Sequence, residues 1–244
     1  MCGRFGLYRP TDALAELFGA HEAPDLRRRW APSYNIAPTR DVIGLAVTRG
    51  GRRVLDLYRW GLVPSWARDP SVGSRLFNAR AEGLAASRAF ADAFGARRLA
   101  IVADGFFEWR PREGRRPQPL FFRRADGAPL AIAGLWESWW ARARGGPDGS
   151  LVSCAMVTTA AGPDLAGVHD RMPVILDPLA LEAWLDPRTR DPRSLEELLR
   201  PPPAGTLVHH AVDPRVGDTG NDDPELVAPY EPEGGDPEPL RLFG

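Results

Sequence analysis

The chain has 244 residues, a net charge of −1 and two cysteines, Cys2 and Cys154. This length suits one large domain with a substantial core, and we find neither an apolar run long enough to span a membrane nor a signal-peptide profile. So few cysteines argue against a disulfide-built secreted domain, and we expect a cytoplasmic protein with no membrane partner.

Charge is unevenly distributed along the chain. From Asp222 onward seven acids face one base, Arg241, which leaves +5 on the first 221 residues. A mildly basic body with an acidic tail is compatible with nucleic acid. The sequence contains no lysine. If this protein condenses with an aldehyde, the N-terminal α-amine is therefore the only candidate amine.

Hydrophobic periodicity and turn residues predict helices and strands in chain order. The first is an amphipathic helix over Thr11–Phe18, capped by Thr11 or Asp12. The others are a hairpin of Val42–Val47 and Arg53–Tyr58, an Ala-rich and partly helical stretch over Phe77–Phe94, a buried strand at Leu99–Ala103, a hairpin of Pro119–Arg124 and Leu130–Trp136, a strand at Leu151–Thr158, helices at Pro178–Leu185 and Ser194–Leu199, and a strand at Thr206–Ala211.

Strands outnumber helices here and do not alternate with them regularly, so the pattern is not that of a doubly wound parallel sheet. We expect an α+β fold with a curved, mostly antiparallel sheet or barrel-like core and flanking helices. Residues 1–230 are expected to form one domain. The stretch 231–244, rich in Pro, Gly and Glu, is expected to be a disordered tail.

Cys2 directly follows the initiator Met1 and precedes Gly3. Because methionine aminopeptidases generally remove Met before a small side chain, we expect the mature chain to begin with Cys2. That residue would carry an α-amine and a thiol, with ordinary pKa values of about 8 and about 8.5, so both are near their nucleophilic forms at neutral pH. The alternative is an ordinary second residue without a chemical role.

Two further side chains are candidates for acid–base work. Glu108 lies between Phe107 and Trp109 after a buried strand, where desolvation is expected to raise the pKa of its carboxyl group. His169 lies in a loop and can transfer protons near neutral pH. The alternatives are a surface carboxylate and a structural histidine. No histidine shows metal-ligand spacing with the cysteines, so we expect no metal and no cofactor.

Asn78 and Arg80 alternate on an extended segment and would share one face. An asparagine can orient a reacting oxygen, and an arginine can pair with phosphate as a fork. Alternatively, Asn78 is a helix cap. Arg4 and Arg171 also suggest phosphate contacts, with solvated surface positions as the alternative.

Trp66, Trp109 and Phe107 interleave with these arginines. Arginines with exposed aromatic rings hold single-stranded nucleic acid by backbone pairing and base stacking, although tryptophan more often belongs to a core.

These clusters stand in a fixed order along the chain: Met1–Phe5, Tyr34–Thr39, Trp60–Trp66, Phe77–Glu82, Ala103–Trp109, Gly134–Glu137, His169–Pro173 and Asn221–Leu226. Together they resemble the SOS response-associated peptidase (SRAP) family of abasic-site-processing proteins, from Cys2 to about Pro229. One departure is Ala100, where relatives often carry Cys.

The resemblance implies a protein that crosslinks itself to abasic sites in single-stranded DNA, shielding the lesion during the DNA damage response. The Cys2 α-amine would form a Schiff base with the sugar aldehyde, a lyase-like step, and the thiol would close a thiazolidine ring. The family name implies a cysteine-type peptidase activity, and the bond concerned would be Met1–Cys2, cut by the protein itself or by an aminopeptidase. The protein would be cytoplasmic, and at the nucleoid when bound to DNA.

The resemblance also implies roles for particular residues. Catalysis would use Cys2, Asn78, Glu108 and His169, and DNA binding would use Arg4, Pro38, Trp66, Arg80, Trp109, Thr158 and Arg171.

Two alternatives stay open at this point: an N-terminal-nucleophile glutamine amidotransferase, and a non-catalytic module that binds single strands. A further hypothesis concerns Pro239–Phe243, which resembles a degenerate sliding-clamp-binding peptide. The alternative there is a random apolar end.

Overall fold

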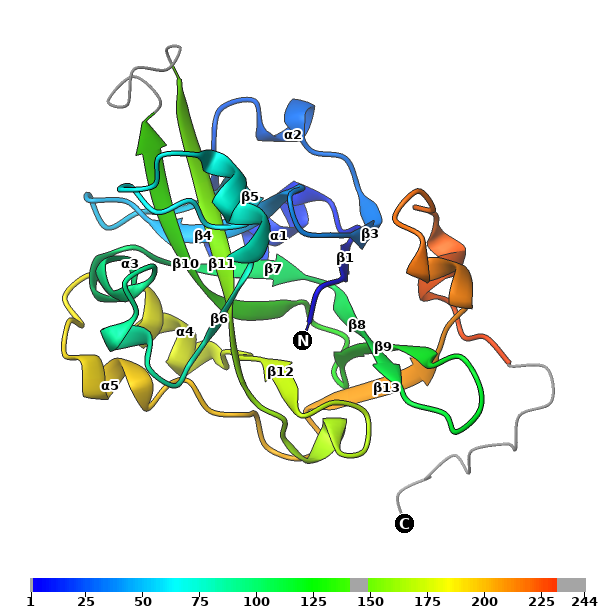
Figure 1. The fold of residues 1–244 in the computed structure, drawn as a ribbon. Coiled ribbons are helices and arrows are strands. Elements are labelled where there is room, and N and C mark those ends of the chain that lie inside the picture. Colours follow the sequence, from blue (N-terminus) through cyan, green and yellow to red (C-terminus); the bar gives the residue numbers. More distant parts are fainter. Residues whose placement is uncertain (1, 141–148, 232–244) are drawn as a thin grey trace.

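The computed structural model describes residues 2–140 and 149–231. Its centre is a closed ring of five strands (Figure 1). The ring consists of β4 (Asp41–Val47), β5 (Arg53–Trp60), β7 (Arg98–Ala103), β10 (Leu130–Trp140) and β11 (Ser150–Ala160). Antiparallel pairing runs from β11 through β10, β7 and β4 to β5. A short parallel pairing between β5 and β11 closes the ring.

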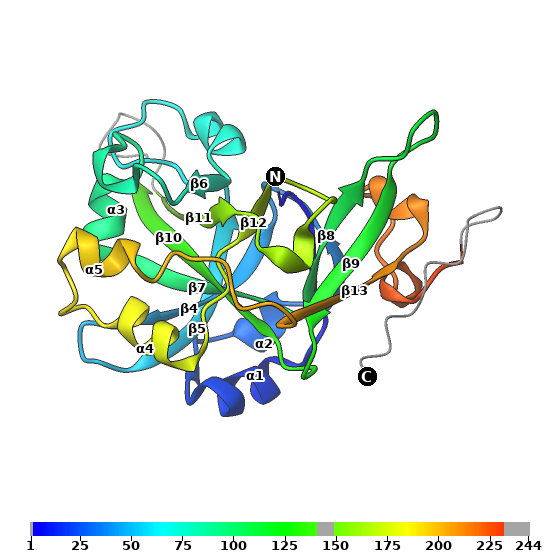
Figure 2. The same ribbon diagram turned by 90° about the horizontal axis from the view of Figure 1, so that it is seen from below.

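A second sheet of five antiparallel strands stands beside the barrel. Its order is β13 (Leu207–Ala211), β9 (Gln118–Arg124), β8 (Gly105–Arg110), β1 (Phe5–Leu7) and β3 (Ser33–Ile36). Three short strands extend the barrel: β12 (Arg171–Pro173) and β6 (Asn78–Arg80) on β11, and β2 (His21–Glu22) on β5. In Figures 1 and 2, the segment leading into β1 lies between β8 on one side and β6 with β12 on the other. The N-terminal residues therefore lie where the two sheets meet.

Short helices surround this framework. The α-helices are α1 (Thr11–Phe18), α2 (Leu26–Arg29), α3 (Ala91–Ala96), α4 (Pro178–Leu185) and α5 (Pro192–Glu196). Single 3₁₀ turns occur at η1 (Pro70–Arg75), η2 (Leu84–Ala86), η4 (Pro163–Leu165), η5 (Pro214–Gly217) and η6 (Pro224–Val227). Helices α3, α4 and α5 gather on one side of the barrel, and η5 and η6 lie beside the second sheet (Figure 2).

Strand β7 of the barrel is covered on both faces. All six residues of β7 are buried, so its sequence reads as a continuous run rather than an alternating pattern. Cys154 on β11 is fully buried among these strands, as its apolar context predicts. At the start of β8, Gly105 lies so close to β9 that a Cβ there would come within 2.5 Å of the Phe122 carbonyl oxygen.

The expected α+β class with a barrel-like, mostly antiparallel core is confirmed. The helices at 11–18 and 178–185 and the hairpin of β4 and β5 are also present as predicted. The stretch 77–94 is partly helical, in η2 and α3, after the extended strand β6.

Three details of the prediction are wrong. The N-cap of α1 is Pro10, with no side-chain cap, so neither Thr11 nor Asp12 caps it. Strands β9 and β10 do not form a hairpin, because β9 pairs with β8 and β13 while β10 pairs with β7 and β11. The last helix is displaced to Pro192–Glu196, since Asp191 caps it by accepting from the Ser194 amide. The extended segment predicted at Asn78 and Arg80 is confirmed as β6, which excludes the alternative of a helix cap at Asn78.

In the part of the chain that the structure describes, no helix is both long and apolar enough to cross a membrane. The tail expected from 231 onward and the proposed clamp-binding peptide at 239–243 lie outside the described residues, apart from Glu231. The boundary at 230 stays a prediction.

Candidate functional site

Cys2 lies three residues before β1 and is fully buried. Its thiol contacts the carbonyl oxygen of Arg4 at 3.8 Å. Its own carbonyl oxygen accepts a 2.7 Å hydrogen bond from the side-chain amide of Asn78 on β6. Strand β6 therefore holds the backbone of the candidate nucleophile directly. Burial, followed by the negative charge of Glu108, raises the pKa of the Cys2 thiol far above its ordinary range, so the thiol is neutral at pH 7.

Glu108 comes from β8, on the other side of the N-terminal segment. Glu108 is 3% exposed, and the three residues before it on β8 are buried as well, so both faces of the strand are covered at this point. Burial raises the pKa of its carboxyl group to about 7, with a further contribution from the charge of Asp170. The pKa rise expected from the aromatic surroundings is thus found, and the surface alternative is wrong. A carboxyl group with this pKa can both donate and accept a proton near neutral pH.

His169 precedes β12 in a half-buried position. Its Nδ1 atom accepts a 2.9 Å hydrogen bond from the Arg171 amide, and the same atom lies 2.9 Å from a carboxylate oxygen of Asp170. One nitrogen cannot accept the first contact and donate to the second. Burial lowers the pKa of the imidazole, which favours the neutral ring that accepts from Arg171 and carries its proton on Nε2.

Arg171 on β12 is held inside the protein. Its two terminal nitrogens donate to the two carboxylate oxygens of Glu82 at 2.8 and 2.9 Å. One of them also donates to the Thr158 carbonyl oxygen at 2.6 Å. The hydrogen bonds to Arg171 lower the pKa of Glu82. Thr158 itself is fully buried, and its backbone pairs with that of Arg80 on β6.

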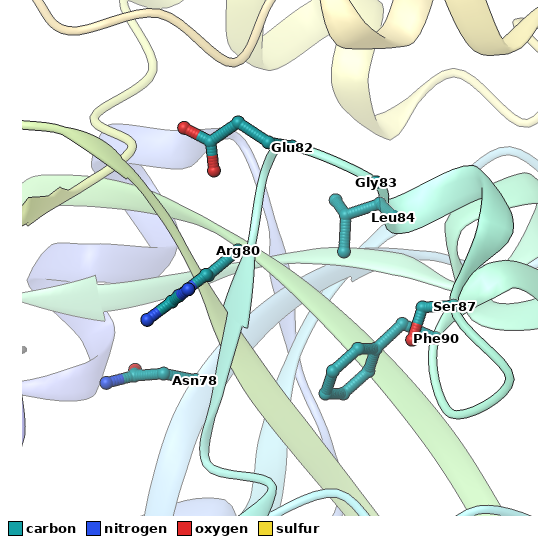
Figure 3. Close-up of a pocket in the computed structure, with 7 residues that line it drawn as sticks. All are labelled: Asn78, Arg80, Glu82, Gly83, Leu84, Ser87 and Phe90. Atoms are coloured by element: carbon teal, nitrogen blue, oxygen red, sulfur yellow. The ribbon is translucent and has the colours of Figure 1, made fainter.

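A pocket of about 350 Å³ opens beside β6 (Figure 3). In this view Asn78, Arg80 and Glu82 extend to one side of the β6 segment, while Leu84 and Phe90 lie on its other side. Asn78 and Arg80 thus share a face, as their alternation predicts. Arg80 is exposed, unlike the half-buried Asn78. The side-chain oxygen of Asn78 is buried and accepts no hydrogen bond within the described residues.

Arg4 points away from β6, toward the C-terminal part of the chain. Its guanidinium group donates to the side-chain oxygen of Asn35 at 2.7 Å and to the Val216 carbonyl at 2.6 Å. It also lies over the ring of Trp109, 5.9 Å from the ring centroid. Burial lowers the pKa of Arg4. The alternative of a solvated surface position is therefore wrong for Arg4.

The remaining candidates differ in exposure. Trp66 is 41% exposed, and the Arg88 guanidinium lies over its ring at 4.6 Å. Trp109 is half-buried against the aromatic cluster of the second sheet. Pro38 is half-buried and precedes Thr39, whose φ of 74° is left-handed and uncommon for a β-branched residue.

The structure therefore brings Cys2, Asn78 and Glu108 together from three separate elements, and the charge of Asp170, next to His169, acts on Glu108. Sequence reasoning missed Glu82 and Asn35. Each is bonded to an arginine that is distant in the sequence, and nothing in the neighbouring residues indicates that contact. Asp104, within the Ala103–Trp109 cluster, is structural: it accepts hydrogen bonds from the amides of Tyr8 and Arg9 and so fixes the end of β1. Within 2–140 and 149–231, no group of three His, Cys, Asp or Glu side chains could hold a metal ion.

Comparison with known proteins gives a consistent result. Residues 1–219 match the family model described as SOS response associated peptidase (SRAP). The chain is 34% identical to the abasic site processing protein YoqW of Bacillus subtilis, covering 93% of this chain and 99% of that protein. It is 33% identical to the abasic site processing protein YedK of Escherichia coli, covering 94% and 100%. It is 30% identical to the abasic site processing protein HMCES of Gallus gallus, covering 95% and 78%.

Solved structures share the fold. A protein from Bacteroides thetaiotaomicron superimposes with a TM-score of 0.83 at 19% identity, covering 94% of this chain and all of that one. A protein from Bordetella bronchiseptica does so with a TM-score of 0.72 at 28% identity, covering 87% of this chain and all of that one.

Proposed function

The chain belongs to the SOS response associated peptidase (SRAP) family, and on that premise we propose that it acts on abasic sites in single-stranded DNA and attaches itself to them covalently through Cys2. The names of the relatives support the substrate. The observation that carries the chemistry is the position of Cys2, which is held by Asn78 while its thiol lies in the field of Glu108.

The reaction needs an amine and a thiol on one residue. Once Met1 is removed, the Cys2 amine adds to the aldehyde carbon of the opened sugar, and loss of water gives an imine. The thiol then adds to the protonated imine: its proton passes to the Glu108 carboxylate, sulfur bonds to carbon, and the C=N electron pair moves to nitrogen. The product is a five-membered thiazolidine, and the net loss is one water. Because the thiol pKa is raised, the amine attacks first.

Glu108 supplies the proton transfers. Its acid form protonates the hydroxyl that leaves as water, and its carboxylate accepts the thiol proton when sulfur attacks. The positive charge of a protonated imine favours the thiolate at that step, which offsets the effect of burial. A pKa of about 7 keeps both forms of the carboxyl group populated at neutral pH. Neutral His169, with its proton on Nε2, donates a hydrogen bond to the reacting group during ring closure and reversal, without giving up the proton.

Asn78 binds the reacting sugar with its other atom. Its amide nitrogen is already used by the Cys2 carbonyl, and its buried oxygen has no donor among the described residues. A buried acceptor without a donor is costly, so a hydroxyl of the opened sugar, or the ring N–H, is a suitable partner.

The flanking strand is held by cations and aromatic rings. Exposed Arg80 pairs with a phosphate beside Asn78. Arg171 joins it when the phosphate displaces Glu82 from its guanidinium group. Arg4, whose Nη1 is bonded inside the protein, contributes its positive charge. Trp66 and Trp109 stack on bases, and Pro38 shapes the path of the strand. Thr158 contributes by holding Arg171. We expect the protein to work in the cytoplasm and, when it is bound to DNA, at the nucleoid.

The Met1–Cys2 bond must be cut before this chemistry can begin. Self-cleavage using the Cys2 thiol and removal by an aminopeptidase both produce the required amine. The masses of purified wild type and Cys2→Ala distinguish the two routes. If only the wild type has lost Met1, self-cleavage is supported. If both have lost Met1, the step belongs to an aminopeptidase, which also accepts alanine.

A denaturing gel tests the proposal. Single-stranded oligonucleotides carry an abasic site, a tetrahydrofuran analogue without an aldehyde, or no lesion. We expect a covalent band with the abasic oligonucleotide alone, lost in Cys2→Ala and kept in Cys154→Ala, which removes the other buried thiol.

Other outcomes of this experiment contradict the proposal. A native-gel shift with all three oligonucleotides and no covalent band means a non-catalytic binder. Glutamine hydrolysis without any DNA adduct means an amidotransferase.

A further inference from the structure

Asn35, which the proposed chemistry leaves unused, joins β3 to the C-terminal part of the chain. Asn35 on β3 is 5% exposed. Its amide nitrogen donates to the carbonyl oxygens of Val216, Asp218 and Asn221, at 3.2, 3.0 and 2.7 Å. With two hydrogens for three acceptors, the amide is fully used. Asn35 therefore holds the loop around η5 against β3.

The same asparagine also holds Arg4. Its side-chain oxygen accepts from the Arg4 guanidinium at 2.7 Å, and that guanidinium donates to the Val216 carbonyl as well. Asn35 and Arg4 thus share one acceptor in the C-terminal segment. Most arginines placed to grip a phosphate present their fork to solvent, whereas here Nη1 is used inside the protein.

The backbone of Arg4 connects this contact to the nucleophile. Its carbonyl oxygen is the partner of the Cys2 thiol at 3.8 Å, and it also accepts a 2.9 Å hydrogen bond from the Phe107 amide. Phe107 immediately precedes Glu108 on β8. A single carbonyl group therefore sets the Cys2 thiol relative to the strand that carries the candidate acid–base residue.

Terminal residues usually fray unless they are tied down, and here the reactive residue precedes the first strand. An error of about 1 Å in the position of a reacting group can cost about 10²-fold in rate. We propose that Asn35 is a positioning residue for Cys2 and that it acts through its hydrogen bond to Arg4. This rests on the proposed function for its effect on rate, but the contacts themselves do not depend on it.

Arg215 provides a matched control. It anchors the same segment through ion pairs with Asp213, Asp223 and Glu225, and none of these involves Arg4 or Asn35. If Asn35 only stabilised the segment, Asn35→Ala and Arg215→Ala would have the same effects. If Asn35 acts through Arg4, only the first substitution disturbs Cys2.

The first experiment compares single-turnover crosslinking to abasic single strands at saturating protein with the affinity for unmodified strands. We expect Asn35→Ala to slow the saturating rate by about 10-fold or more and to change the affinity by less than about 2-fold, while Arg215→Ala keeps the rate. Arg4→Gln added to Asn35→Ala should slow the rate no further than the slower single variant, because the two residues act as one unit. An unchanged rate in Asn35→Ala, equal losses in Asn35→Ala and Arg215→Ala, or a loss confined to affinity would overturn the proposal.

A second measurement needs no DNA and no removal of Met1. The alkylation rate of the Cys2 thiol by iodoacetamide is followed by mass spectrometry, with buried Cys154 as the internal reference. We expect Asn35→Ala to speed alkylation of Cys2 by about 10-fold while Cys154 stays protected, and Arg215→Ala to leave both unchanged. This result would stand even if no crosslink formed in the wild type. Equal protection of Cys2 in all three proteins, or loss of protection at both cysteines, would overturn the positioning role.

Discussion

Replacing Glu108 by Gln keeps the size of a buried side chain and removes its titration. Burial raises the pKa of this carboxyl group from an ordinary value of 4.5 to about 7. At 1.36 kcal/mol per pKa unit, this corresponds to about 3 kcal/mol of preference for the neutral form. The folded protein therefore binds more protons than the unfolded chain between pH 4.5 and 7, and the contribution of Glu108 to stability is lost as pH rises through this window.

The substitution consequently has opposite effects on stability and rate. Above pH 7 the wild type contains a buried carboxylate that Glu108→Gln lacks, so the variant should be more stable at pH 8 by up to about 3 kcal/mol, and the two proteins should converge at pH 4.5. The crosslinking rate should fall by about 10²- to 10⁴-fold, because acid–base catalysis is lost. The wild-type rate should also change with an inflection near pH 7 that the variant lacks.

Urea unfolding at several pH values and single-turnover crosslinking measure the two effects. His169 and His210, whose imidazole pKa values burial lowers, are present in both proteins, so their titration cancels in the comparison. Parallel stability curves for the two proteins, or a variant that keeps the inflection near pH 7, would refute the role given to Glu108.

Three other substitutions test separate parts of the account. Cys2→Ser keeps the α-amine but not the thiol. On a denaturing gel it should therefore give an adduct only when borohydride traps the imine. An adduct that is stable without borohydride would contradict ring closure by sulfur. Glu82→Gln frees the Arg171 guanidinium from its carboxylate partner. Filter binding should then show tighter binding of single strands, and the slope of log K against log salt concentration should be steeper by about 0.7. Glu16→Gln, which removes an exposed acid on α1, should not change this slope. Gly105→Ala places a Cβ 2.5 Å from the Phe122 carbonyl oxygen and should lower the free energy of unfolding in urea by about 1–3 kcal/mol. Gly95→Ala has no atom within 4 Å of its Cβ and should be neutral or stabilising. Equal effects of the two substitutions would contradict the packing of β8 on β9.

The elements that follow local rules could be predicted from the sequence. The periodicity of 11–18 and the continuous apolar run of β7 identify both elements. The carboxyl group of Glu108, between two aromatic residues after a strand, shows its raised pKa for a local reason, namely burial. Asn78 and Arg80 share a face because side chains alternate along any strand.

Pairings between distant segments could not be predicted in this way. The turn at Gly127, with φ of 74°, is present, but strands β9 and β10 diverge from it into different sheets, since their partners lie elsewhere in the chain. The same limit hides the contact of Arg4 with Val216, which spans more than two hundred residues. It also hides the ion pair between half-buried Arg171 and exposed Glu82, which lie on different elements.

The mass of the product tests the central claim most directly. Purified protein is mixed with a single-stranded oligonucleotide carrying one abasic site, and the intact mass is measured before and after borohydride treatment. The account predicts one adduct whose mass equals that of the protein without Met1 plus the oligonucleotide minus one water, unchanged by borohydride because no imine remains. No adduct, an adduct that retains Met1, or an adduct that gains hydrogen on reduction would contradict the thiazolidine.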